Sequence, residues 1–370
     1  MRIAIVGAGP AGAFCAYHLA RRGAQVTLID RHEHAWEKPC GGGVPPKVRE
    51  RFPEVMAYEG PKRPVEIGNF VSPTGVPIRL TSRAPMWIVA RRDFDGYVRA
   101  LAREAGARFL NARVTGVSLS RREFRLGGVD ERFDFVVGAD GAKSVVRRDL
   151  LGPLPAEFLS ATVGYFLEGR RQEATTWFMD RPGYVWAFPR SDHLCLGGGS
   201  SDPDFDVWEA VETIRAEHFA DWPVRQKWSA PIPFVRDSAF FDLPTTGPGW
   251  AVIGDAAGHV DALTGEGILY AMWGGRLLAG ALLAQRPGDY EKTWRRSFGR
   301  ELAKTADLSR RFYRPESITR VFDVAARSAT MRRFLMDMMT DQPSYLKTGN
   351  MFLWRLPKIG LELVSHYLKA

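Results

Sequence analysis

The first thirty residues carry the feature that most constrains the fold. An apolar run, residues 2–6, leads directly into the glycine-rich segment GAGPAG at residues 7–12. Apolar residues then recur at helical spacing through residues 10–22, and a second apolar run, residues 25–29, ends at Asp30. This order of strand, glycine turn, helix and strand predicts a βαβ unit with two parallel neighbouring strands.

The three glycines of the turn have different physical tasks. Gly7 permits the tight turn, Gly9 lets the backbone approach a pyrophosphate, and Gly12 allows helix and strand to pack closely. The start of the helix presents unpaired N–H groups and a positive dipole to phosphate. Asp30, at the end of the second strand, can accept hydrogen bonds from ribose hydroxyls. The segment therefore predicts a dinucleotide-binding site.

Two later segments are also rich in glycine. Residues 38–43, KPCGGG, either lie flat against a planar ligand or form a flexible surface loop. Residues 254–258, GDAAG, follow an apolar run at 250–253 and precede a helix predicted for 265–283. If this distant segment contacts the same ligand as the first one, an extended FAD is favoured over a freely exchanging NAD.

The amino-acid pattern changes between residues 161 and 234. Short, aromatic-rich runs there predict an antiparallel sheet. They are residues 161–168, 175–179, 184–188 and 193–197. Tyr184, Trp186 and Phe188 alternate with smaller residues, so all three rings are expected on one face of a strand. They either line an apolar site or belong to the sheet core.

Other segments complete the expected architecture. Strands are predicted at 65–71, 77–80, 86–90, 107–110, 113–120 and 133–137, and helices at 93–105, 290–311 and 317–339. The fold class is α/β: a Rossmann-like FAD-binding domain with an inserted antiparallel-sheet substrate domain and a helical C-terminus. The expected boundaries are 1–160 with 235–288 for the first, 161–234 for the second and 289–370 for the third.

Charge and cysteine content narrow the function classes. The net charge is +9, but the cations are dispersed, which disfavours nucleic acid as a partner. Cys15, Cys40 and Cys195 contain no C-x-x-C pair, so we predict neither a disulfide framework nor a metal site. No signal peptide or long apolar run is present, and a cytoplasmic protein is expected.

The tail at 346–368 mixes Phe, Leu and Trp with Lys and Arg. It is interpreted either as an amphipathic segment that binds an anionic membrane, at its inner face, or as a helix packed on the body with a solvated basic face.

Four segments together resemble the geranylgeranyl reductase family, within the p-hydroxybenzoate-hydroxylase-like FAD superfamily. They are GAGPAG at 7–12, KPCGGG at 38–43, YVWAFP at 184–189 and GDAAGHVDALTGEGI at 254–268. The second and third are the more specific to the reductases. Residues 262–264 read Ala-Leu-Thr where relatives often carry Asn-Pro, which implies a different substrate position.

The resemblance implies FAD as cofactor and assigns residues to it. The implied contacts are Gly7, Gly9, Pro10, Ala11, Gly12, Asp30, Arg31, Cys40, Gly41, Gly43, Arg91, Val114, Asp140, Gly254, Asp255, Gly265 and Gly267. Among these, the Cys40 loop would line the isoalloxazine and the Val114 backbone would lie near adenine. Gly265 and Gly267 would place a helix N-terminus beside the flavin, where developing negative charge is stabilised.

The implied reaction is hydride transfer from reduced flavin to a carbon–carbon double bond of a polyprenyl, geranylgeranyl-type lipid. Cys40, Tyr184 and Trp186 are the candidate catalytic residues, and Tyr184, Trp186 and Phe188 the candidate substrate contacts. Cys40 either delivers a proton or only shapes the pocket. No second dinucleotide fingerprint is present, so the expected electron donor is NAD(P)H at a shallow site, ferredoxin or another donor.

Two alternatives share this fold: a flavin monooxygenase such as an aromatic hydroxylase, and a flavin-dependent halogenase. Halogenases have a W-x-W-x-I-P strand to which Tyr184-x-Trp186-x-Phe188-Pro189 is related. Tyrosine at the first position and the Cys-Gly-Gly loop disfavour the halogenase. Within the reductases, diphosphate, ether-lipid, chlorophyll and menaquinone side chains all remain open as substrates.

Overall fold

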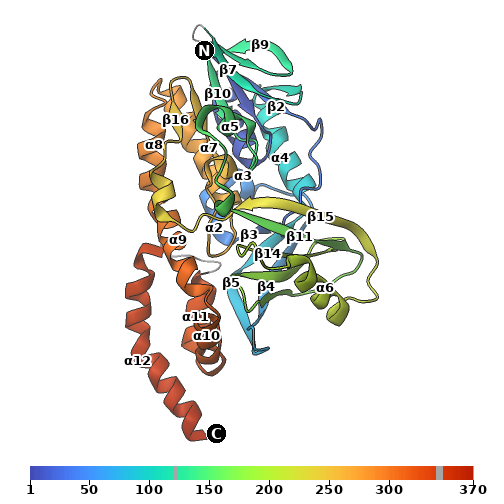
Figure 1. The fold of residues 1–370 in the computed structure, drawn as a ribbon, viewed down its shortest axis with the longest axis vertical. Helices are drawn as coiled ribbons and strands as arrows, with labels where there is room; N and C mark the ends of the chain where they lie inside the picture. Colours follow the sequence, from blue (N-terminus) through green and yellow to red (C-terminus); the bar gives the residue numbers. More distant parts are fainter. Residues whose placement is uncertain (121–122, 339–344, 370) are drawn as a thin grey trace. The chain divides into compact units, whose positions relative to one another are not determined.

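The computed structural model describes residues 1–120, 123–338 and 345–369, which fall into two compact units (Figure 1). Unit 1 consists of Met1–Lys38, Arg91–Leu159 and Pro231–Ala306, and unit 2 of Pro39–Ala90, Ser160–Ala230 and Asp307–Ala370. Within the described ranges, no helix combines the length and the apolar character needed to cross a bilayer.

The described residues of unit 1 form a six-stranded sheet in the order β16-β17-β10-β1-β2-β6. The strands are β1 Arg2–Val6, β2 Gln25–Asp30, β6 Arg108–Asn111, β10 Phe135–Gly138, β16 Thr246–Gly247 and β17 Trp250–Val252. All neighbours are parallel except β16 and β17 at the edge. The predicted βαβ unit is confirmed, and the strand predicted at 133–137 lies beside β1 as β10.

Helices and a small second sheet surround these strands. The helices are α1 Pro10–Ala20, α4 Arg91–Glu104, α5 Val145–Leu151, α7 Ile268–Leu283 and α8 Asp289–Trp294; a π-helical turn, Arg295–Gly299, then leads into α9 Arg300–Phe312. β7 Val117–Ser120, β8 Glu123–Leu126 and β9 Val129–Phe133 form the small sheet. α1 packs closely on α7, because a Cβ at Gly275 would lie 2.6 Å from the carbonyl oxygen of Ala11.

The described residues of unit 2 form an eight-stranded sheet in the order β15-β11-β14-β13-β12-β4-β5-β3. The strands are β3 Gly43–Val44, β4 Lys62–Val71, β5 Pro77–Val89, β11 Leu159–Leu167, β12 Ala174–Phe178, β13 Gly183–Pro189, β14 Leu194–Ser200 and β15 Val224–Pro233. The predicted antiparallel neighbours β11, β14, β13 and β12 are confirmed. A helix not foreseen, α6 Val207–His218, packs on one face.

Sheet membership differs from the expectation at residues 39–90. We expected them in the FAD-binding domain, but β4 pairs with β12 in the sheet of unit 2. β5 is also one continuous strand, where two were predicted, because β4 pairs along it with a register shift between Val65 and Ile67. Apolar alternation predicts a strand but does not reveal its partner.

The C-terminal part of unit 2 is helical, as expected. It contains α10 Pro315–Arg327, α11 Ala329–Met336 and α12 Tyr345–Lys369. The helix predicted over 317–339 is interrupted at Ser328, whose side chain accepts a hydrogen bond from Met331 N and begins α11; residue 339 lies outside the described residues. Two short helices that were not predicted, α2 Pro46–Arg51 and α3 Pro53–Met56, follow the KPCGGG segment.

Candidate active site

The parallel strands of unit 1 end at one edge of the sheet, where α/β proteins bind ligands. The loops after β1 and β10 touch there. Gly7 has a φ of +100°, and a Cβ at this position would lie 2.3 Å from the carbonyl oxygen of Ala139. Only glycine fits this close approach, so the first glycine of the turn is fixed by the neighbouring loop.

The start of α1 forms an open backbone cradle. Gly9 is the N-cap in extended conformation and provides no side-chain cap, and Pro10 occupies the first turn. A Cβ at Gly9 would meet nothing within 4 Å, whereas one at Gly12 would lie 1.9 Å from the carbonyl oxygen of Gly7. The cradle therefore fits a phosphate group, as the glycine spacing predicts.

Asp30 holds this turn as well as facing the edge. Its Oδ2 accepts a hydrogen bond from Ala8 N at 2.8 Å, and its Oδ1 accepts one from His32 N at 2.8 Å. Buried Arg99 lies 3.6 Å from Asp30 Oδ2 and donates to the carbonyl oxygens of Ala8 and His32. Arg99 was missed, although its spacing from Arg91 and Asp95, four residues apart on one helix, could have revealed it.

Three predicted cofactor residues have other contacts. Arg91 donates from Nε and Nη2 to the carboxylate of buried Asp95, each at 2.7 Å. Arg31 is exposed and donates to His32 Nε2. Val114 is buried in the cluster beneath the small sheet. Their roles toward FAD stay predictions.

Inside unit 1, the GDAAG segment contacts the start of α1 and Lys38. Gly254 has a φ of +62°, and a Cβ there would lie 2.9 Å from Ala11 Cβ at the start of α1. Asp255 Oδ2 lies 3.5 Å from Lys38 Nζ, the first residue of the KPCGGG segment. Its Oδ1 lies 3.4 Å from where a Cβ of Gly267 would be. The structure thus brings these predicted residues to one place.

Asp261, which sequence reasoning missed, organises the loop before α7. Its Oδ1 accepts hydrogen bonds from Leu263 N at 2.7 Å and Thr264 N at 3.2 Å, and its own carbonyl oxygen accepts one from Gly265 N. Gly265 has a φ of +73°. Asp261 is fully buried, and its Oδ2 has no hydrogen-bond partner in the described part of the chain. Such an orphaned acceptor fits a site that a ligand completes.

Asp140 and its neighbours anchor α5. The Asp140 carboxylate accepts hydrogen bonds from the Ser144 hydroxyl and from Val145 N, and burial raises the pKa of this carboxyl. Arg147 is buried, lies over the Phe240 ring and donates to the carbonyl oxygen of Ala256 in the GDAAG segment. Asp140 therefore stabilises the loop that follows β10, independently of any contact with a ligand.

His259 is a packing residue. Its ring lies 4.4 Å from the centroid of Trp294 and 5.2 Å from that of Phe298. Neither ring nitrogen has a hydrogen-bond partner among the described residues. Burial, assisted by the charge of Arg147, lowers its pKa to about 3. The imidazole is therefore neutral.

The Cys40 loop in unit 2 is fixed by residues distant in sequence. The carbonyl oxygen of Cys40 accepts hydrogen bonds from Arg190 Nη2 at 2.7 Å and from Cys195 Sγ at 3.3 Å. Its thiol accepts one from Gly42 N at 3.3 Å. Gly42 has a φ of +78°, and a Cβ there would lie 2.1 Å from the carbonyl oxygen of Val89. This glycine loop is held against β5.

Arg190 is the missed residue of this loop. It is only 2% exposed, and its guanidinium lies 4.7 Å from the centroid of the Phe166 ring. Nη1 lies 3.1 Å from His193 Nε2, and His193 in turn contacts Asp192. No local pattern links Arg190 to Cys40, from which 150 residues separate it.

The three aromatic residues of β13 share one face, as predicted. The Trp186 centroid lies 5.7 Å from that of Tyr184 and 6.5 Å from that of Phe188. Val185 and Ala187 belong to the core cluster on the α6 side. A Cβ at Gly41 would lie 2.9 Å from Phe188, so the Cys40 loop adjoins one end of the row.

Glycines in neighbouring strands let indoles lie flat on this face. A Cβ at Gly197 would lie 2.5 Å from Trp186 and 2.7 Å from Trp228, and one at Gly164 would lie 2.5 Å from Trp228. Both indole N–H groups are buried and find no acceptor among the residues described. The face therefore combines apolar rings with two unused donors.

The row continues beyond β13. The Phe178 centroid lies 6.1 Å from that of Tyr184, and Phe322 of α10 lies 5.4 Å from Phe178. We call the series Phe188, Trp186, Tyr184, Phe178 and Phe322 the aromatic track. It extends from the Cys40 loop to α10, and its neighbouring rings contact one another at tilted or edge-to-face angles.

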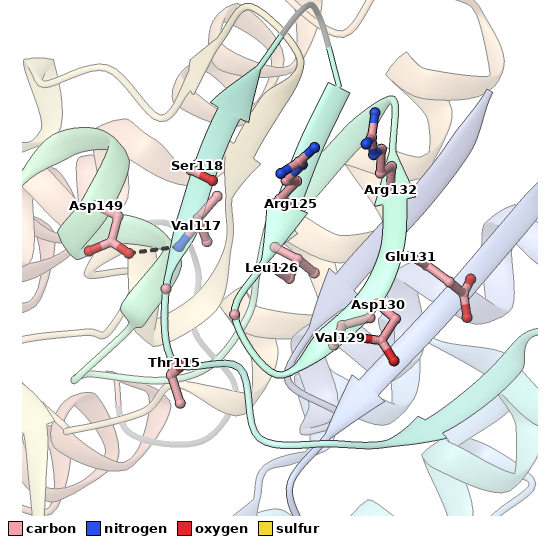
Figure 2. A pocket seen from close by; sticks show the side chains of 12 residues that line it. Thr115, Val117, Ser118, Arg125, Leu126, Val129, Asp130, Glu131, Arg132 and Asp149 are labelled. Carbon is pink, nitrogen blue, oxygen red and sulfur yellow. Dashed lines mark hydrogen bonds between the residues drawn. The ribbon is translucent and has the colours of Figure 1, made fainter.

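A separate hollow of about 610 Å³ lies beside the small sheet of unit 1 (Figure 2). Arg125, Arg132, Asp130 and Glu131 line it, and Asp149 accepts a hydrogen bond from Val117 N at its wall. This charged lining of both signs does not suit an isoprenoid chain. None of the predicted site residues lies in its walls.

The comparisons with known proteins agree with this geometry. A family profile described as FAD dependent oxidoreductase matches residues 2–39, the βαβ unit with the glycine turn. Together with the reductases among the curated relatives, this match defines the class: an FAD-dependent oxidoreductase.

Curated relatives narrow the class further. Geranylgeranyl diphosphate reductase of Rhodobacter capsulatus is 30% identical over 303 residues, which cover 76% of this chain and 74% of that protein. Digeranylgeranylglycerophospholipid reductase of Methanothrix thermoacetophila is 28% identical, with 84% of this chain and 87% of that protein covered. The chain belongs to the geranylgeranyl reductase family.

A solved structure shares the fold. The geranylgeranyl bacteriochlorophyll reductase-like protein of Thermoplasma acidophilum matches with a TM-score of 0.77 at 20% identity, over 92% of this chain and 96% of that one.

Proposed function

We propose that this protein reduces carbon–carbon double bonds of a geranylgeranyl-type polyprenyl lipid. The observation that carries the proposal is the aromatic track, a series of five aromatic side chains that begins at the Cys40 loop. Planar rings let a long methyl-branched chain lie along them without demanding hydrogen bonds from it. An aromatic hydroxylase would need only a compact site for one ring.

Residues of unit 1 are proposed to hold FAD. The cradle at Gly9 and the start of α1 would bind the pyrophosphate, and Asp30 the ribose hydroxyls. Asp255 would face the ribityl or phosphate region, and the orphaned Oδ2 of Asp261 would accept a donor in the completed site. When bound, reduced FAD supplies the hydride for the reaction.

The chain itself has to supply a proton. An isolated alkene accepts hydride poorly unless the neighbouring carbon is protonated, so that two new C–H bonds replace the π bond. Cys40 is the candidate donor. Its sulfur accepts from Gly42 N, which leaves the S–H proton for a second acceptor, and its carbonyl is fixed by Arg190. Tyr184 and Trp186 would hold the chain beside it.

The electron donor and the place of action belong to the same proposal. NAD(P)H or ferredoxin would reduce the bound cofactor. Stopped-flow measurement of flavin reduction with each donor distinguishes the two. A polyprenyl substrate is itself a lipid, so the enzyme would meet it at an anionic membrane surface, in keeping with the net charge of +9.

The test is an anaerobic reaction of the dithionite-reduced holoenzyme with geranylgeranyl diphosphate, followed by mass spectrometry. Products heavier by pairs of hydrogens are expected, and Cys40→Ala is expected to slow their formation while leaving FAD bound. Product that gains oxygen or halogen once air or halide is admitted, with no hydrogen added anaerobically, would contradict the proposal in favour of a monooxygenase or halogenase.

A further inference from the structure

Helix α12 has two apolar faces, and the inner one packs against other residues of unit 2. Tyr345 and Ile359 are buried. Phe352 packs on Phe334 of α11 with centroids 5.2 Å apart, and Arg355 pairs with Asp337 at 2.8 Å. Figure 1 shows α12 alongside α10 and α11, which these contacts explain. The inner face therefore docks the helix on unit 2.

The outer face is apolar and bare. Six side chains on it are each more than half exposed: Leu346, Leu353, Trp354, Leu361, Val364 and Leu368. Trp354 is 86% and Leu368 80% exposed. With 3.6 residues per turn, all six fall within an arc of about 100°. We call them the α12 stripe. A contiguous exposed stripe of this kind marks a surface that another apolar phase covers.

Charge indicates which phase that is. By the same helical geometry, Lys347 and Lys358 border the stripe on one side, and exposed Tyr367 borders it on the other. Glu362 is the single acid in the sequence of α12, and it turns inward to accept hydrogen bonds from Ser328 and Thr330. The outer face thus combines leucines, interfacial aromatics and cations, without a carboxylate.

We propose that the α12 stripe lies in the plane of an anionic lipid bilayer. The leucines would enter the boundary of the acyl chains, and Lys347 and Lys358 would contact lipid phosphates. A second copy fits less well, because pairing two stripes would bring their bordering lysines together with no carboxylate between them. The inference rests on the proposed function only for the reason why the protein would bind a membrane, which is access to a lipid substrate. Phe322 places the end of the aromatic track on α10, against which α12 packs.

The test uses the intact holoenzyme and sedimentation with vesicles of phosphatidylglycerol or of phosphatidylcholine. Wild-type protein is expected to sediment with the anionic vesicles and more weakly with the neutral ones. The double variant L353E/L361E is expected to lose at least about tenfold in partitioning, since two leucines that would enter the lipid are replaced by carboxylates. Met56→Glu, at an exposed apolar position of α3, is the matched control and keeps binding.

Further readouts separate the possible failures. The double variant is expected to keep its FAD content, its unfolding temperature and its turnover of detergent-dispersed substrate, because both leucines are exposed on the outer face of α12. Unchanged vesicle binding by the variant would overturn the inference. So would a wild-type dimer that ignores vesicles and becomes a monomer in the variant. Vesicle binding without any turnover would leave the α12 proposal standing and sink the proposed function.

Discussion

Single residues away from the reacting atoms position the candidate catalytic groups. The Cys40 carbonyl is held by the guanidinium of Arg190 and the thiol of Cys195, both donated from another part of the sheet. Arg190 is a positioning residue, because it acts through the Cys40 backbone. A buried charged donor to a carbonyl contributes roughly 1.5–3 kcal/mol when its alternative is an unpaired buried group.

Arg190→Lys is therefore expected to lower the free energy of unfolding by about 1–3 kcal/mol and turnover by roughly tenfold. Lysine cannot reproduce the planar fork that reaches Cys40 and His193 together. Chemical denaturation and turnover measure the two effects. The pH dependence of turnover is expected to change as well, which a purely structural loss would not produce. Exposed Arg181→Lys is the control.

Acid sensitivity is also a single-residue property. Burial lowers the pKa of His259 from 6.5 to about 3 and that of His18 to about 4. Between these values and 6.5 the unfolded chain binds protons that the folded protein does not, so stability falls as pH falls through this window. Each histidine is expected to lower the free energy of unfolding by roughly 2–3 kcal/mol when the pH is lowered to about 4.5.

His259→Phe is expected to keep the ring packing and to flatten this dependence. Denaturation curves at neutral pH and at about pH 4.5 measure the change. A variant as acid-sensitive as the wild type would show that His259 titrates normally in the folded state. His34→Gln, at an exposed position, serves as the control.

Elements owe their shape to glycines as much as to apolar patterns. Gly197 of β14 leaves space for Trp186 and Trp228 to lie on the sheet. Gly197→Ala is expected to lower the free energy of unfolding by about 1–3 kcal/mol, since two large rings have to move. Near-ultraviolet circular dichroism should report displaced tryptophans, and the KM for the polyprenyl substrate should rise.

Gly280→Ala in α7 is the matched substitution. A Cβ at Gly280 meets nothing within 4 Å, so a neutral or slightly stabilising change is expected, of up to about 1 kcal/mol. Equal losses at both positions would contradict the account of the aromatic face.

The same elements show what sequence could predict. Local periodicity predicted β1, α1, β2 and the alternation of rings on β13, because those signals lie within one element. It did not reveal that β4 and β5 join the sheet of unit 2, since strand partners lie far away in sequence. Arg190 was missed for the same reason, since the Cys40 carbonyl that it contacts lies 150 residues away. Asp261 accepts hydrogen bonds from Leu263 N and Thr264 N, so its role does have a local signal.

At the scale of the whole molecule, the chain alternates between the units, with three segments in each. Three distant segments of unit 1 contribute the proposed FAD contacts, so the cofactor would tie them together. FAD at a hundredfold excess over its Kd is expected to stabilise the folded protein by about 2.7 kcal/mol. Thermal unfolding of the apoprotein with FAD or FMN measures this. FMN is expected to do less, because it lacks the adenosine that Asp30 would hold.

The central claim is that electrons leave the bound cofactor for a carbon–carbon double bond. The most direct measurement follows oxidation of the reduced holoenzyme by geranylgeranyl diphosphate without oxygen, together with the mass of the product. We expect the substrate to gain one hydrogen pair for each cofactor oxidised. A cofactor that stays reduced until oxygen is admitted, beside unchanged substrate, would contradict it.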